Sequence, residues 1–286
     1  MSRTTDARAG FRDYWQAVGR ERRGRGELLL SPVIAGEVPP RAVQVYLPPG
    51  YREGREDFPV IYLHDGQNLF DPATAYAGSW HAERALDRLA HRGRPVIAVA
   101  IPNAGVRRIH EYASFRDRRY GGGGGEAYLD WLTERVQPLV ERSFRVQRGP
   151  ETTAIAGASM GGLISLFAFW ARRQNFGLVG AMSPSLFFAE EALTLGIERH
   201  PPAVGRAYLD VGTLEGRRNR RRKTPPKSPS GAMKRLRRLR RVLERSGFKE
   251  GQDLRWIEEP GGRHDEAAWA HRLPGMLEFL FPVPGA

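Results

Sequence analysis

Residues 154–166 read AIAGASMGGLISL and contain the pattern G-x-S-x-G, with Ser159 at its centre. An apolar run of small residues ends at Gly157, and an apolar helical segment begins at Met160, which predicts a strand, a sharp turn and a helix. Gly157 and Gly161 let the strand and the helix pass close together, because glycine has no Cβ. The stretch therefore places the Ser159 hydroxyl on an exposed turn above a sheet, the position of a nucleophile.

The length and composition of the chain suit one large domain. It has 286 residues, of which 41% are hydrophobic and 10% aromatic, so it can bury a sizeable core. We expect residues 1–286 to form a single domain, with an N-terminal extension over 1–26 and a flexible basic insertion over 216–231. No apolar run has the length of a bilayer span, and residues 1–8 lack the apolar stretch of a secretory signal.

The sequence contains no cysteine. This excludes disulfides, thiolate catalysis and cysteine-bound metals. Together with the missing signal and span, it predicts a cytoplasmic protein. The sequence predicts no cofactor and no metal site.

Strand and helix patterns alternate along the chain. Residues 42–47 alternate like a half-buried strand, whereas 58–63 and 95–100 are continuous apolar runs typical of strands covered on both faces. Five glycines at 121–125 predict a flexible lead-in to a helix. Further strands are predicted at 178–182, 207–211 and 254–257, and helices at 80–92, 128–144, 190–197, 232–246 and 266–281. This order predicts the α/β class, with a mainly parallel central sheet and helices on both faces.

A serine nucleophile needs a histidine base, and that base needs an acid to orient it. When the nucleophilic serine lies on a strand–turn–helix, the acid and then the histidine follow it along the chain. Three histidines follow Ser159 and are therefore candidates for the base. His264 lies in a loop between the last predicted strand and the last predicted helix, from which it can reach the top of the sheet, so we expect it to be the base. His200 precedes a Pro-Pro turn and His271 lies within an amphipathic helix, where surface or packing roles are typical.

Two carboxylates near the strand at 207–211 are candidates for the acid. Asp210 still belongs to the strand pattern, where a structural hydrogen bond can occupy it. Glu215 lies beyond the strand and can reach over the sheet edge. We expect Glu215 to be the acid and keep Asp210 as the alternative.

The oxyanion of a tetrahedral intermediate needs preorganised N–H donors. The backbone amide of Met160, directly after the nucleophile, is predicted to be one of them. Gln67 is predicted to supply the other, from the loop after an early central strand, where Gly66 lets the chain turn. Four side chains are further candidates for lining the pocket, with packing or surface ion pairing as the alternative: Trp80, Arg108, Tyr112 and Trp269.

In these segments the chain resembles the Putative esterase family of α/β-hydrolases, which includes feruloyl and acetylxylan esterases, S-formylglutathione hydrolases, enterochelin esterases and mycolyltransferases. The similar segments are VYLPPGY (45–51), VIYLHDGQN (60–68), GASMGG (157–162), VGTLE (211–215) and GRHDEAAW (262–269). The resemblance implies an α/β-hydrolase fold from about residue 40 onward and a serine carboxylic-ester hydrolase that works through an acyl-enzyme. The family often carries its acid at the fourth position of Gly-Thr-x-Asp/Glu, which is Glu215 here. The Asp-Gly-Gln loop is most similar to the enterochelin esterase branch.

The net charge of +13 is concentrated in residues 217–241, which hold thirteen Lys and Arg and no Asp or Glu. A neutral body with one basic segment indicates a local feature. We expect a solvated, flexible loop on a basic helix, and keep as the alternative that these cations gather an anionic ester at the mouth of the site.

Two alternative functions remain open. An acyltransferase would pass the acyl group to another hydroxyl, and the sequence does not separate it from a hydrolase. A binder of polyanions would use the arginine-rich segment, but no aromatic residues interleave its cations for base stacking, which argues against nucleic acid. The partner we expect is a small-molecule ester, and the oligomeric state is left open.

Overall fold

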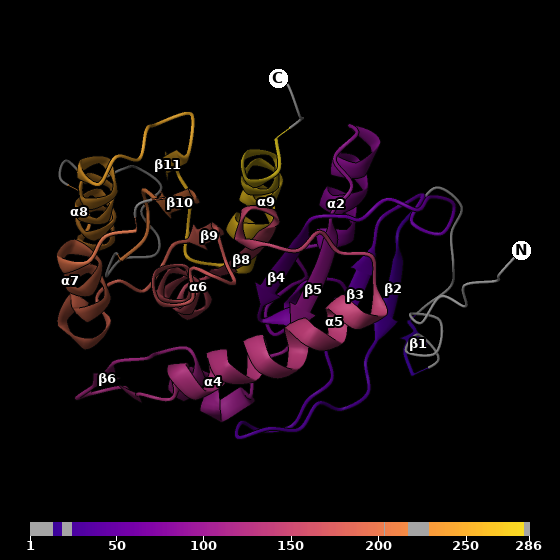
Figure 1. Cartoon of the computed structure of the whole chain (residues 1–286). Coiled ribbons are helices and arrows are strands. Elements are labelled where there is room, and N and C mark those ends of the chain that lie inside the picture. Colours follow the sequence, from indigo (N-terminus) through magenta and orange to yellow (C-terminus); the bar gives the residue numbers. More distant parts are fainter. Residues whose placement is uncertain (1–13, 19–24, 203, 217–228, 283–286) are drawn as a thin grey trace, which may run out of the picture.

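The computed structural model describes residues 14–18, 25–202, 204–216 and 229–282 (Figure 1). Within these ranges one sheet has the strand order β1-β2-β3-β5-β4-β8-β9-β10-β11. Its strands are β1 (Gln16–Ala17), β2 (Glu27–Leu30), β3 (Gln44–Leu47), β4 (Val60–His64), β5 (Ile97–Ile101), β8 (Thr153–Ala158), β9 (Leu178–Met182), β10 (Arg206–Gly212) and β11 (Leu254–Glu259). A small separate hairpin is formed by β6 (Arg116–Asp117) and β7 (Gly121–Gly122).

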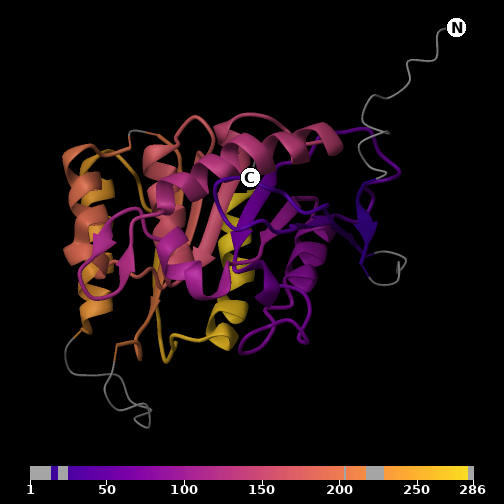
Figure 2. The same ribbon diagram turned by 90° about the horizontal axis from the view of Figure 1, so that it is seen from below.

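The sheet is parallel from β5 to β11, and β1, β2 and β3 pair antiparallel at one edge. Figures 1 and 2 show β1 at one side of the molecule and α8 at the opposite side. The α-helices are α2 (Ala82–His91), α3 (Arg108–Glu111), α4 (Gly125–Trp131), α5 (Gln137–Ser143), α6 (Met160–Ala171), α7 (Ala192–Arg199), α8 (Gly231–Arg245) and α9 (Glu266–Leu280). The prediction of a mainly parallel α/β sheet is therefore confirmed.

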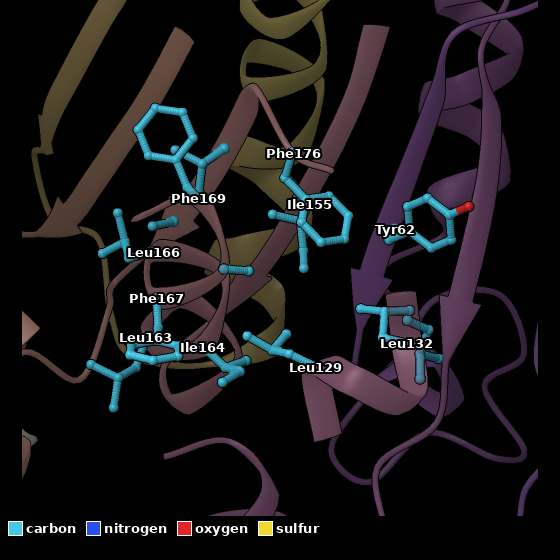
Figure 3. Packing of buried hydrophobic residues seen from close by; sticks show 14 of the residues in the cluster. Tyr62, Leu129, Leu132, Ile155, Leu163, Ile164, Leu166, Phe167, Phe169 and Phe176 are labelled. Carbon is cyan, nitrogen blue, oxygen red and sulfur yellow. The ribbon is translucent and has the colours of Figure 1, made fainter. Parts of the chain in front are cut away.

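Successive residues of a strand point to opposite faces of the sheet, so a continuously apolar strand presents apolar side chains on both faces. Helices cover both of these faces. In β4, Val60 and Tyr62 join one hydrophobic cluster, and Ile61 and Leu63 join the other. The first cluster contains residues of α4, α5, α6, α7 and α8, whereas the second contains residues of α2 and α9. Figure 3 shows part of the first cluster, in which Tyr62 lies edge-on to Phe176 with ring centroids 6.0 Å apart. The continuous apolar runs thus belong to strands covered on both sides.

The described part of the basic segment is largely neutralised by acidic neighbours. On α8, Leu236, Leu239 and Leu243 are buried, as their spacing predicts. Four arginines of this helix form ion pairs: Arg235 with Glu191, Arg237 with Glu258, Arg238 with Glu198 and Arg240 with Glu244. The Arg-rich residues 217–228 of the predicted insertion lie outside the described residues.

Other differences from the sequence predictions concern local chain geometry. The glycine run at 121–125 is part of defined structure and not a flexible lead-in, because Gly121 and Gly122 form β7 and Gly125 begins α4. A Cβ at Gly122 would lie 2.9 Å from the Cβ of Ala113, so close packing accounts for a glycine there. Most of the predicted extension at 1–26 lies outside the described residues, and its described part adds β1 to the sheet edge. In the described ranges no helix has the length and apolar character needed to cross a membrane.

The carboxyl ends of the parallel strands lie along one edge of the sheet, where ligands bind in open α/β folds. The loop after β4 holds the 3-10 turn η1 (Gly66–Asn68), and the turn after β8 is Ser159. The loops after β10 and β11 hold Glu215 and His264. The sheet therefore delivers residues from four distant parts of the sequence to one edge.

Candidate active site

Ser159 lies on a strained turn between β8 and α6. Its φ is 57° and its ψ is −119°, values that a non-glycine residue rarely adopts. A Cβ at Gly157 would lie 2.8 Å from the backbone carbon of Gly161, and a Cβ at Gly162 would lie 3.2 Å from the carbonyl oxygen of Gly157. Gly157 and Gly162 therefore permit the predicted close crossing of β8 and α6, whereas a Cβ at Gly161 would approach His64 and Asp65, each at 3.2 Å.

Ser159, His264 and Glu215 form one hydrogen-bonded chain. The Oγ of Ser159 is 2.9 Å from Nε2 of His264, and Nδ1 of His264 is 2.9 Å from Oε2 of Glu215. The Glu215 side chain is almost completely buried, whereas that of His264 is 42% exposed. Because Glu215 occupies Nδ1 as an acceptor, the imidazole presents Nε2 to the serine as the atom that can take a proton.

Backbone contacts explain why the acid and the histidine meet. The N–H of Leu214 donates to the carbonyl of Gly262 at 3.0 Å, and the N–H of Gly261 donates to Oγ1 of Thr213 at 2.9 Å. A Cβ at Gly212 would overlap the carbonyl of Gly262. The loops after β10 and β11 are thus joined side by side, which places the side chains of Glu215 and His264 in contact.

The second oxygen of Glu215 is also fully engaged. Its Oε1 accepts the backbone N–H of Gly212 and the hydroxyl of Ser183, both at 2.6 Å. Burial raises the pKa of Glu215, but the hydrogen bonds from His264 and Ser183 outweigh burial and hold the pKa below its ordinary value. Glu215 is therefore a carboxylate near neutral pH.

Asp210, the alternative acid, faces a different partner. It is completely buried, its Oδ1 lies 3.1 Å from Nη1 of Arg272, and the same oxygen accepts the N–H of Ser183 at 3.1 Å. Burial raises its pKa to about 7, against the opposing effect of Arg272. Asp210 therefore makes structural contacts with Arg272 and Ser183, as its position in the strand suggests. Glu215 is the carboxylate that contacts His264.

The raised pKa of Asp210 predicts a pH-dependent stability difference. The native state keeps this proton up to about pH 7, whereas the unfolded chain releases it near the ordinary pKa of 3.8. The native state holds more protons in that window, so rising pH destabilises it relative to Asp210→Asn. Relative to the variant, the free energy of unfolding of the wild type should fall by about 1 kcal/mol per pH unit between about pH 4 and 7. Urea unfolding of both proteins across this range tests the prediction, and a constant difference would contradict it.

The two predicted oxyanion donors come from neighbouring segments. Met160 begins α6 directly after Ser159, and the first N–H groups of a helix have no intrahelical acceptor. Gln67 lies in η1, and its side-chain oxygen accepts the N–H of Asn103 at 3.1 Å. A Cβ at Gly161 would lie 3.2 Å from Oδ2 of Asp65, so the chain just before η1 packs against the first turn of α6.

An ion pair anchors this loop. Asp65 has a φ of 55°, and its carboxylate accepts two hydrogen bonds from Arg108, at 2.7 and 2.8 Å. Its backbone N–H donates to the hydroxyl of the buried Tyr112 at 3.1 Å. Arg108 and Tyr112 therefore hold the loop in place. Their contacts are those of the alternative given for them, packing and ion pairing, and not of residues that line the cleft.

The two tryptophans also pack near the site. Trp80 and Trp269 are buried, with ring centroids 6.1 Å apart. Trp269 lies edge-on to the His264 ring at 5.0 Å. His200 and His271 are exposed, as expected for surface residues.

A cleft of about 780 Å³ opens at Ser159 and His264. One wall is aromatic: the ring of Tyr120 lies 6.0 Å from that of Phe187 and 6.1 Å from that of Phe188. Arg235 and Arg263 also line the cleft. The sequence did not predict the aromatic wall. The wall forms where the β6–β7 hairpin meets the segment after β9, and no spacing of residues in the sequence indicates that these two segments lie together. Sequence reasoning also missed Ser183 and Ser185, although their position directly after a parallel strand was a signal that could have found them.

Comparisons with known proteins agree with this architecture. The family described as Putative esterase matches residues 39–280. The Uncharacterized protein YbbA of Bacillus subtilis is 30% identical over 247 residues, covering 84% of this chain and 92% of that protein. The Siderophore triacetylfusarinine C esterase of Aspergillus fumigatus is 31% identical over 158 residues, covering 52% of each chain. The solved structure of Siderophore hydrolase EstA from Aspergillus nidulans superposes with a TM-score of 0.67 at 22% identity, covering 88% of this chain and 93% of that one, which shows a shared fold.

Proposed function

Because this chain belongs to the Putative esterase family and is an ester hydrolase, we propose that Ser159, His264 and Glu215 form its catalytic triad. The observation that carries this assignment is the continuous chain from Ser159 Oγ through both nitrogens of His264 to Glu215, with two contacts of 2.9 Å. Such a chain turns a weakly nucleophilic hydroxyl into an attacking group, because the imidazole takes its proton as the bond forms.

The proposed reaction has two halves. Ser159 Oγ attacks the ester carbonyl while Nε2 of His264 takes the hydroxyl proton, and the same nitrogen then protonates the leaving alcohol. A water molecule, deprotonated by His264, then attacks the acyl-enzyme, and the same nitrogen returns the proton to Ser159 Oγ as the acid is released. Throughout, Glu215 holds the imidazole tautomer and balances the charge of the imidazolium.

We propose that the backbone amides of Met160 and Gln67 bind the oxyanion. Met160 follows the nucleophile at the start of α6. The packing of Asp65 against Gly161 supports a second donor from the adjoining η1. Aligned N–H groups at this position stabilise the charge that develops on the carbonyl oxygen.

The proposed substrate is a bulky ester that lays an aromatic ring against Tyr120, Phe187 and Phe188. Tyr120 is 44% exposed and Phe187 46% exposed, so both rings offer free surface beside Ser159. Arg263 also lines the cleft, where its charge would attract a substrate with negative charge. Arg235, a further lining residue, is paired with Glu191 at 3.0 Å, which offsets its charge. A siderophore ester, the substrate class named for the Aspergillus fumigatus relative, is a further candidate for a cleft of about 780 Å³.

The test of the function is turnover of p-nitrophenyl esters with and without a serine-directed phosphonate. We expect turnover that the phosphonate abolishes, with the label recovered on the peptide that contains Ser159. Persistent turnover after complete labelling would contradict the assignment.

The aromatic wall predicts a selective effect of Phe187→Ala. Loss of one ring should lower kcat/KM for a methyl ester of an aromatic acid by about 3- to 10-fold, the size of an aromatic contact. Turnover of a short acetyl ester should change by less than about 2-fold, because it does not reach the wall. Tyr76→Ala is the control, since Tyr76 is an exposed aromatic residue that does not line the cleft. Equal losses with both esters would contradict the subsite.

A further inference from the structure

Ser183 follows β9 directly and is a strained, buried residue. It is 3% exposed and has a φ of 46°, a left-handed conformation that is unfavourable for a residue with a side chain. Strain of this kind persists only where the surroundings enforce it, and it concentrates at functional sites. The position therefore raises the question of what its hydroxyl does.

The Ser183 hydroxyl uses its whole hydrogen-bonding capacity. It donates to Oε1 of Glu215 at 2.6 Å, and it accepts from Nε1 of Trp269 and from Nη2 of Arg272, both at 3.0 Å. An indole and a guanidinium can only donate, so the hydroxyl proton has one direction left, toward Glu215. The two donors therefore fix the orientation of the Ser183 hydroxyl toward the acid.

The same hydroxyl also links the acid to a buried cation. Nη2 of Arg272 lies 3.7 Å from Oε1 of Glu215, while Nη1 lies 3.1 Å from Oδ1 of Asp210. The Ser183 hydroxyl hydrogen-bonds to both groups, at 3.0 Å from Arg272 and 2.6 Å from Glu215, so hydroxyl, guanidinium and carboxylate form one compact cluster. Loss of the hydroxyl would leave Oε1 of Glu215 with the N–H of Gly212 and with Arg272 as a competing partner, which would weaken the hold of the carboxylate on the imidazole.

Trp269 connects Ser183 to the base as well. The indole N–H is anchored on the Ser183 hydroxyl, and the indole ring lies edge-on to His264 with centroids 5.0 Å apart. One hydroxyl thus fixes both the carboxylate that bonds Nδ1 of His264 and the ring that packs against the imidazole.

We propose that Ser183 is a positioning residue of the triad, which holds Glu215 on His264. This role rests on the proposed function, because it acts only through the Glu215–His264 contact.

The test is a double-mutant cycle of Ser183→Gly and Glu215→Gln. Glycine adopts a positive φ without strain, so the variant removes the hydroxyl and relaxes the backbone. With p-nitrophenyl acetate, kcat should fall by about 10- to 100-fold and KM by less than about 3-fold. In the Glu215→Gln background the same change should cost less than about 2-fold, because the acid through which Ser183 acts is already lost.

The matched control is Ser143→Ala. Ser143 is also completely buried and accepts an indole N–H, that of Trp15 at 3.1 Å, but it lies on α5. Its kcat should stay within about 2-fold of the wild type, since lost hydroxyls act locally. Should Ser183→Gly fail to fold, Ser183→Ala enters the same cycle.

Two results would overturn this role. One is an unchanged kcat in a folded Ser183 variant, and the other is an equal loss with and without Glu215, which would make Ser183 a structural residue only. Full activity of Ser159→Ala, measured in the same series, would instead overturn the proposed function itself and with it the role of Ser183.

Discussion

Ser159→Ala should lower kcat for p-nitrophenyl acetate by about 10⁶-fold and leave the protein folded. The substitution removes only the hydroxyl, whose oxygen is hydrogen-bonded to Nε2 of His264. Alanine keeps the Cβ, so the unusual backbone angles of residue 159 are no more strained than before. The packing of α6 against the sheet involves its apolar residues and is left unchanged.

The measurement is steady-state turnover together with a melting curve. A melting temperature close to that of the wild type would show that the loss is chemical. The variant should also bind substrate, because the aromatic wall and the loop before η1 remain. A Ser159→Ala protein that keeps most of its turnover would exclude Ser159 as the nucleophile.

The sequence could predict the fold because its signals are local. The glycine pattern around Ser159 and the two-sided apolar strands, such as 58–63, each depend on neighbouring residues in the chain. Their consequences are confirmed in the parallel sheet and in the two clusters that cover it. Periodicity and steric need act over a few residues, and this is the range that a single sequence reveals.

The remaining parts of the site depend on contacts between distant segments. Ser183 meets Arg272 and Trp269 across 89 and 86 residues, and Arg108 meets Asp65 across 43. No spacing or propensity encodes such pairs. The glycine run at 121–125 shows the same limit, because a run that looks flexible in sequence becomes ordered when Gly122 packs against Ala113.

The second large effect is the loss of kcat in Glu215→Gln, which distinguishes Glu215 from Asp210 as the acid. Glu215→Gln should lower kcat by about 10⁴-fold, since a neutral amide cannot hold the imidazole tautomer or balance the imidazolium. His264→Ala should approach the loss seen in Ser159→Ala, because base and nucleophile act as a unit. Asp210→Asn should cost less than about 10-fold in kcat, because Asp210 contacts Arg272 and Ser183 and not the imidazole.

Stability measurements separate folding from chemistry in these variants. Asp210 and Glu215 are both buried beside Arg272, so either substitution can lower the melting temperature. Turnover divided by the folded fraction then isolates the chemical effect of each substitution. If Asp210→Asn were the inactive folded protein and Glu215→Gln the active one, the acid would be Asp210, and the 2.9 Å contact between Glu215 and His264 would have a structural role only.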